Sequence, residues 1–162
     1  MIRDDITVRS LIEECVEFKR PLAKASGIVL DADIKDSRAS LQGDRRLLRA
    51  AVSNLIDAAM KHTRYGGHVA VGHEASHDRD SITVTYSGDG IPYDELCEMQ
   101  DIFCRSNRVH EGDSQEFNRR LIGLSIARDV ADLHSGRIGV RSREGKGATF
   151  SIHLPRYCMQ AV

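Results

Sequence analysis

Apolar residues recur at helical spacing in three long stretches of the chain and at alternate positions in several shorter ones. The clearest helical stretch runs from Arg45 to Thr63, with a core-facing stripe of Leu48, Val52, Leu55 and Ala59. Asp44, just before it, is a good N-cap residue. Asn54, Ala58 and Lys61 lie on a neighbouring stripe, at i, i+4 and i+7. This arrangement is typical of a helix that packs on a sheet and borders a pocket. The alternative is a plain core helix with a solvated Asn and Lys.

Two further long helices are predicted. Thr7 can cap the first, which runs to about Lys24 and presents one face made of Val8, Leu11, Cys15, Phe18 and Leu22. Pro21 should loosen its last turn, because proline removes a backbone donor. The second ends at Ser135-Gly136 and has a stripe of Ile122, Ile126, Val130 and Leu133. A shorter helix is expected over residues 93–102.

Strand patterns complete the chain. They occupy residues 28–33, 69–71, 82–86, 138–140 and 149–152, with a short edge piece at 40–42. The polar residues 73–80 read as a hairpin loop, and residues 143–147 as a turn. The order of elements predicts an α+β fold. It is a two-layer α/β sandwich in which a mixed sheet of about five strands carries three main helices on one face.

Composition narrows the function classes. The 162 residues suffice for one domain with a real core, and hydrophobic and charged contents of 41% and 29% are ordinary for a globular protein. The formal charge is -1 and residues of both signs are interspersed, so the sequence shows no basic patch of the kind that binds nucleic acid. We find no apolar run of transmembrane length and no signal peptide, so we expect no direct membrane contact by this domain.

The four cysteines do not suggest a disulfide framework or a metal site. They are Cys15, Cys97, Cys104 and Cys158, and none of them forms a CxxC pair. Cys97, Cys104 and His110 fit no zinc-binding spacing. We therefore expect the thiols to be reduced and the chain to have no set of residues that binds a metal ion.

Two segments have the character of ligand-site loops. Residues 87–92, Ser-Gly-Asp-Gly-Ile-Pro, form a glycine-rich loop directly after a strand. Residues from Phe103 to about Asn118 are polar and aperiodic, and a loop of that length in a compact domain is usually a lid or disordered.

These motifs, in this order, resemble the catalytic and ATP-binding domain of two-component sensor histidine kinases, of the GHKL superfamily and Bergerat fold. Residues 54–63, NLIDAAMKHT, are similar to the family's Asn box. Residues 133–138, LHSGRI, and 145–155, GKGATFSIHLP, are similar to its closing helix, strand, turn and strand. The whole chain, 1–162, resembles one such domain with an ATP-lid-like loop at about 103–118. The family's phosphoacceptor helical domain has no counterpart in it.

The resemblance implies ATP with Mg²⁺ as ligands and a cytoplasmic location, alone or as the cytoplasmic part of a membrane-bound sensor. A helical phosphoacceptor (dimerisation) domain and a response regulator would be the partners. Asn54 would be catalytic by orienting the reacting groups. The nucleotide would be held by a larger set, namely Asn54, Lys61, His62, Gly88, Gly90, Ile91, Arg105, Arg108, Gly123, Leu124, Gly147 and Thr149.

Four positions depart from the family pattern. Ala58 replaces the Asn that holds Mg²⁺, and Tyr86 replaces the Asp that accepts a hydrogen bond from the adenine amino group. Arg119 and Leu121 replace glycines of the phosphate loop. Asp57 could substitute as a metal ligand but is expected to pair with Lys61 at i+4. Each lost contact costs about 1–3 kcal/mol. The sequence therefore predicts weak or no nucleotide binding and a role mainly as a signalling interaction module.

Two alternatives remain open. The first is an active sensor kinase that binds ATP in a non-standard way and phosphorylates a His on a helical partner domain. The second is a serine kinase of the anti-sigma type, which the kinase-like C-terminal hairpin disfavours.

Overall fold

The computed structural model describes residues 1–35, 38–104, 115–143 and 145–156, with the backbone only for 115–120. The elements in chain order are β1 (Asp4–Thr7), α1 (Val8–Ala25), β2 (Val29–Asp33), β3 (Ser40–Gly43), α2 (Arg45–His62), β4 (His68–Ala75), β5 (Arg79–Tyr86), α3 (Tyr93–Cys104), α4 (Gln115–Leu133), β6 (Arg137–Arg143) and β7 (Gly147–Pro155).

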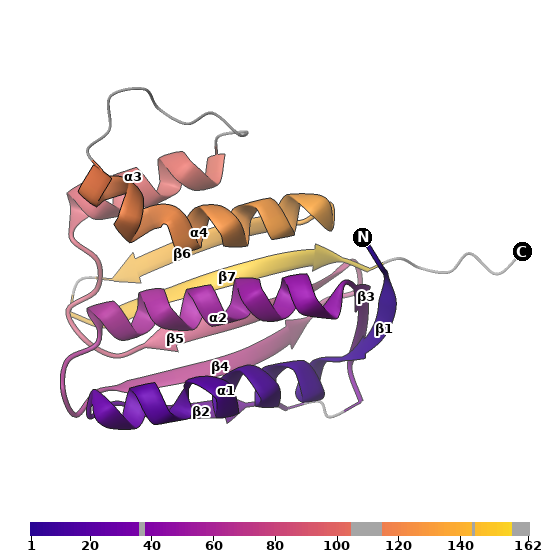
Figure 1. Cartoon of the computed structure of the whole chain (residues 1–162), viewed down its shortest axis with the longest axis horizontal. Helices are drawn as coiled ribbons and strands as arrows, with labels where there is room; N and C mark the ends of the chain where they lie inside the picture. Colours follow the sequence, from indigo (N-terminus) through magenta and orange to yellow (C-terminus); the bar gives the residue numbers. More distant parts are fainter. Residues whose placement is uncertain (36–37, 105–114, 144, 157–162) are drawn as a thin grey trace, which may run out of the picture.

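One mixed five-stranded sheet, in the order β2-β4-β5-β7-β6, carries the helices. Strands β2 and β4 are parallel, and the other neighbouring pairs are antiparallel. Helices α1, α2 and α4 all lie on the same side of this sheet, with α3 beside α4 (Figure 1). The predicted α+β fold with helices on one face is confirmed. The sequence did not predict β1, which pairs antiparallel with β3 in a separate two-stranded sheet.

Helix α2 is anchored at its N-terminus as predicted and also by an unforeseen histidine. The Asp44 carboxylate caps the helix by accepting from the backbone N–H groups of Arg46 and Leu47. His134, buried after α4, has Nε2 2.9 Å from the backbone N of Asp44 and Nδ1 2.7 Å from the carbonyl oxygen of Val130. Only a neutral imidazole that donates from Nδ1 and accepts at Nε2 satisfies both neighbours. His134 thereby joins the end of α4 to the start of α2.

Helix α1 buries only part of the predicted face, because Val8, Leu11 and Cys15 are buried and its last two members are not. Its buried residues are Val8, Leu11, Ile12, Cys15, Val16 and Ala23. Phe18 and Leu22 are exposed, so their predicted burial is wrong. The Phe18 ring instead lies 5.5 Å from the Lys19 ammonium and 5.2 Å from the Arg49 guanidinium. Thr7 occupies the N-cap position, but its side chain makes no capping hydrogen bond in the described structure.

The predicted stripe of α4 is also mostly on the wrong face. Ile122, Ile126 and Leu133 are exposed, and only Val130 of that stripe is buried. The face that meets α2 and the sheet is made of Leu121, Leu124, Ala127, Val130 and Ala131. Alanines let two helices approach closely, so a face with small side chains can form the better-packed contact. The consequence for the site is that Leu121 points inward.

The hairpin between β4 and β5 is tighter than predicted. The strands extend into the polar stretch, and only residues 76–78 connect them. His73 and Asp80 are buried and 2.9 Å apart, and Arg156 donates two 3.0 Å hydrogen bonds to the Asp80 carboxylate. Because these charged groups satisfy one another, residues that read as a solvated loop occupy strand positions.

The loop predicted at 103–118 is shorter at both ends. Phe103 and Cys104 belong to α3, and residues 115–118 belong to α4. The remainder, 105–114, lies outside the described residues and includes Arg105, Arg108 and His110. None of the helices in the described part of the chain combines the length and apolar character that a membrane crossing requires.

Candidate functional site

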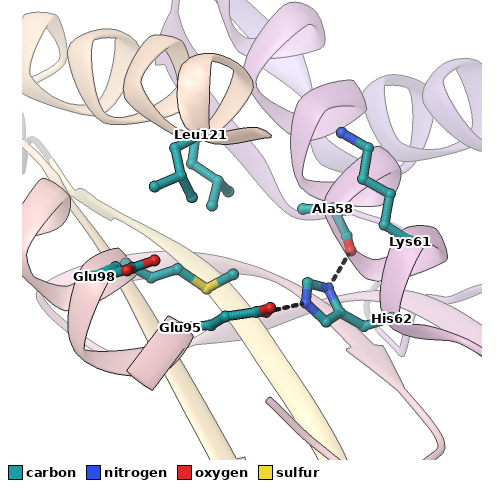
Figure 2. A pocket seen from close by; sticks show the side chains of 8 residues that line it. Ala58, Lys61, His62, Glu95, Glu98 and Leu121 are labelled. Carbon is teal, nitrogen blue, oxygen red and sulfur yellow. Dashed lines mark hydrogen bonds and ion pairs between the residues drawn. The ribbon is translucent and has the colours of Figure 1, made fainter. Parts of the chain in front are cut away.

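A cavity of about 280 Å³ lies where α2, α3 and α4 meet. Helix α2 contributes Ala58, Lys61 and His62, α4 contributes Leu121 and Leu124, and α3 contributes Glu95, Glu98 and Met99. Figure 2 shows Leu121 and Ala58 facing the same space, with the carboxylates of α3 on the opposite side. The cavity thus has an apolar wall from α4, a wall from α2 that carries Lys61 and His62 beside Ala58, and an acidic wall from α3.

His62 connects two of the cavity's walls. Its Nδ1 is 3.0 Å from the carbonyl oxygen of Ala58, and its Nε2 is 3.0 Å from Oε2 of Glu95 (Figure 2). A carbonyl and an ionised carboxylate both accept hydrogen bonds, so a protonated imidazole can donate to both at once. The pair ties α3 to the C-terminal turn of α2 and holds the Glu95 carboxylate at the cavity.

Tyr86 is buried next to this pair, on the helix-facing side of β5. Its residue exposure is 1%, and its ring centroid lies 6.0 Å from that of His62 and 6.4 Å from that of Phe150. The hydroxyl has no hydrogen-bond partner among the described residues. Burial raises the pKa of Tyr86 above the usual tyrosine range, and the nearby Glu95 charge raises it further. A packed neutral phenol therefore occupies the position for which the sequence analysis predicts the loss of an adenine-binding carboxylate.

Two other departures from the family pattern border the cavity directly. Leu121 is 7% exposed and lines the cavity, and Ala58 lines it with a methyl group. Arg119 lies in α4, within the stretch described by backbone only. Neither lining side chain can donate to a phosphate or bind a metal, because both are hydrocarbon.

Asn54 and Gly123 face each other across α2 and α4. A Cβ atom placed on Gly123 would lie 3.6 Å from Cβ and Cγ of Asn54. The predicted catalytic residue therefore lies on the α4 side of α2, next to Gly123, the glycine that remains of the predicted phosphate loop. Asp57 does not pair with Lys61 as predicted, because its carboxylate lies 2.8 Å from Nζ of Lys19.

Five predicted residues of the described part of the chain are not brought to the cavity. Its lining includes none of Gly88, Gly90, Ile91, Gly147 or Thr149.

Their contacts show what these positions do instead. The N–H of Ile91 donates to Oγ of Ser142 at 2.8 Å. The Thr149 hydroxyl lies 3.1 Å from that of Thr85, on the sheet face opposite the helices. Gly147 has φ +80° and lies against the Tyr86 carbonyl, where only glycine fits. These groups support the β5–β7 framework.

Sequence reasoning missed the acidic wall. Glu95, Glu98 and Met99 lie at i, i+3 and i+4 of α3, a spacing that places them on one helix face. That spacing was a usable signal, although nothing in it says that the face borders a cavity.

Within the described residues, no group of three His, Cys, Asp or Glu side chains is placed to hold a metal ion.

Comparison with known proteins identifies relatives over most of the chain. The profile of the family described as "Histidine kinase-, DNA gyrase B-, and HSP90-like ATPase" matches residues 43–157. The alginate biosynthesis sensor protein KinB of Pseudomonas aeruginosa is 30% identical over 135 residues, covering 83% of this chain and 22% of the relative. The heme sensor protein HssS of Staphylococcus aureus (strain Newman) is 31% identical over 152 residues, covering 94% of this chain and 31% of the relative. The chain therefore spans less than a third of either relative.

Solved structures share the fold. The catalytic domain of histidine kinase ThkA superposes with a TM-score of 0.77 at 22% identity, covering 96% of this chain and 97% of that domain. Full-length ShkA in complex with AMPPNP gives a TM-score of 0.78 at 24% identity, covering 96% of this chain and 31% of ShkA.

Proposed function

Because the chain belongs to the histidine kinase-, DNA gyrase B- and HSP90-like ATPase family, we propose that it is a two-component signalling domain with a degenerate nucleotide pocket. In this proposal the domain binds MgATP weakly or not at all and acts mainly as an interaction module in the cytoplasm. Its partners are a helical phosphoacceptor domain and a response regulator. One homologous fold, that of ThkA, has been solved in complex with the response regulator TrrA.

The inward-pointing Leu121 carries this proposal. In the family, glycines at the corresponding positions let backbone N–H groups at a helix N-terminus approach phosphate oxygens, whereas Leu121 lies inside α4, which begins at Gln115. Here the Leu121 side chain occupies part of the space that a phosphate would need, and it lines the cavity together with Leu124 and Met99. A triphosphate placed there would lose its water and meet hydrocarbon instead of donors, which is unfavourable.

The charges of the cavity point the same way. Glu95 and Glu98 contribute two carboxylates to the lining, against the single ammonium of Lys61 and the imidazole of His62. The Nε2 of His62 is already engaged by the Glu95 carboxylate at 3.0 Å, so it is not available to a phosphate. Like charges at short range disfavour each other, and a triphosphate would add negative charge beside Glu98.

The expected loss of affinity is large. The adenine acceptor, the metal ligand and the glycine approach are three contacts, each worth about 1–3 kcal/mol. If half of that sum is lost, about 3 kcal/mol, affinity falls by roughly a hundredfold. A site with a dissociation constant of about 10 µM would then bind with a constant of about 1 mM.

A second candidate function is an active kinase that binds ATP in a non-standard way. It is favoured by Lys61, which lines the cavity and forms no ion pair within the described residues. Asn54 also keeps its place next to Gly123. A cation and an amide at these positions are the groups that phosphoryl transfer uses for positioning and charge neutralisation.

Thermal unfolding with and without 1 mM MgATP separates the two functions. A site with a dissociation constant near 10 µM would gain about 2.7 kcal/mol, which raises the Tm by roughly 5–10 °C. A millimolar site gains only about 0.4 kcal/mol, a shift of one or two degrees at most. We expect the smaller shift, with or without magnesium. A magnesium-dependent shift above five degrees would overturn the proposal and support the kinase.

Two variants of α4 test whether the side chain of Leu121 obstructs nucleotide binding. Leu121→Ala removes hydrocarbon from the cavity wall and should enlarge the MgATP-dependent shift. Ile122→Ala is the matched control, because Ile122 is the exposed neighbour on α4. Equal shifts in both variants would show that the wall at Leu121 does not limit nucleotide entry.

A further inference from the structure

The face of the sheet opposite the helices carries a cluster of positive charge. On this face His153 of β7 pairs across the ladder with Ser81 of β5 on one side and with Arg137 of β6 on the other. Two residues further along β6 from Arg137 is Gly139, and two beyond that is Arg141. The strand β6 is the edge of the sheet, so this cluster faces open space on that side.

The His153 imidazole is fixed in place and has one free ring nitrogen. Its Nδ1 lies 2.7 Å from Oγ of Ser81. Its Nε2 lies over Gly139, since a Cβ atom built on that glycine would be 3.9 Å from it. Within the described residues Nε2 has no hydrogen-bond partner. The free nitrogen is therefore presented between the positions of Arg137 and Arg141.

Three arginines lie near enough to the His153 ring for their charges to act on it. They are Arg137 and Arg141 of β6 and Arg79 at the start of β5, and all three residues are exposed. None of them forms an ion pair with a carboxylate in the part of the chain that the structure describes. Neighbouring arginines without ion pairs are suited to bind an oxyanion, because each presents a planar fork of donors.

We propose that His153, Arg137, Arg141 and Arg79 form an oxyanion-binding site on the open face of the sheet, for a phosphate- or sulfate-type group. The imidazole Nε2 donates one hydrogen bond from above Gly139, and the flanking guanidinium groups supply the charge. The site is separated by the sheet from the cavity lined by Leu121, so it is independent of nucleotide binding there.

The electrostatics of His153 agree with this geometry. Burial lowers the pKa of His153, and the charges of Arg79, Arg141 and Arg137 lower it further, while Glu74 on β4 opposes them. An oxyanion bound between the arginines would offset their charge and favour the imidazolium form. Anion binding and protonation of His153 are therefore linked, and each should strengthen the other.

The test is an NMR titration of the His153 ring resonances in the 162-residue chain. The pKa is measured once in chloride and once in sulfate at equal ionic strength, because sulfate keeps a constant charge over this pH range. We expect sulfate to raise the pKa of His153 by about half a unit. Half-saturation should fall in the millimolar range, as exposed charge pairs are individually weak. Equal pKa values in the two salts would overturn the proposal.

Arginine variants decide whether the effect is local. Arg137→Gln and Arg141→Gln should each weaken sulfate binding up to about fivefold. Arg143→Gln is the matched control, since it removes the same charge from the same strand but pairs with Gly147, away from His153. If Arg143→Gln weakens binding as much as Arg137→Gln, the effect is a general one of net charge and the site is refuted. The wild-type titration does not depend on how any variant folds.

Discussion

Replacing Tyr86 with phenylalanine should stabilise the protein. The phenol is 1% exposed, and its hydroxyl has no partner among the described residues. A buried polar group without a hydrogen bond costs about 1–3 kcal/mol. Phenylalanine keeps the ring contacts with His62 and Phe150 and removes only the oxygen. We therefore expect the free energy of unfolding to rise by about 1 kcal/mol, or 2–4 °C in Tm.

The free energy of unfolding at alkaline pH gives a second test of whether the Tyr86 hydroxyl is buried without a partner. Burial and Glu95 raise the pKa of Tyr86 in the folded state. Above about pH 10, the ordinary tyrosine pKa, the unfolded chain releases the phenol proton while the folded protein retains it. The free energy of unfolding then falls as pH rises, by up to about 1.4 kcal/mol per pH unit. Phenylalanine has no such proton, so the advantage of the variant should widen above pH 10.

Urea denaturation at pH 7 and pH 10.5 measures both effects. Tyr65→Phe is the control, because that ring is 89% exposed and the change should stay within about 0.5 kcal/mol. If Tyr86→Phe lowers the free energy of unfolding by 1 kcal/mol or more, the hydroxyl has a partner and the reasoning is wrong. The phenol would then be a candidate ligand contact instead of a filler of the pocket.

The other predictions concern the restoration of nucleotide binding and the close packing of two glycines. The double variant Ala58→Asn with Tyr86→Asp should enlarge the MgATP-dependent thermal shift more than either change alone. If the double variant shows no gain, the residues of α4 are what prevents nucleotide binding. Gly43→Ala should cost about 1–3 kcal/mol in urea unfolding, because its Cβ would lie 2.8 Å from the His134 ring. Gly147→Ala should cost about 3 kcal/mol or more by the same measurement, since its Cβ would meet the Tyr86 carbonyl at φ +80°. Near-neutral glycine variants would contradict both packing arguments.

Part of the candidate site could be read from the sequence because it lies on one helix. Ala58, Lys61 and His62 share a face of α2, and the helical period alone brings them together. Leu121 was recognised as a departure from a glycine pattern, but its orientation was not. The apolar stripe of Ile122 and Ile126 was the more conspicuous one in the sequence, and it is exposed.

The sequence by itself determined the order of elements and their kind. Alternation in β5 and β7, helical spacing in α2 and turn glycines between them are local patterns, and local patterns are set by backbone geometry. Such patterns sufficed for the α+β sandwich and for the cap at Asp44.

Only the tertiary structure decided which faces meet. A helix with two apolar stripes can bury either one, and the choice in α4 depends on how closely α2 can approach it through alanine side chains. The acidic wall of Glu95 and Glu98 reaches the cavity because α3 packs beside α4. Likewise, His153 and Arg137 become neighbours only through the register of β7 and β6. These contacts join residues far apart in the chain, and their free energy depends on packing that no local pattern encodes.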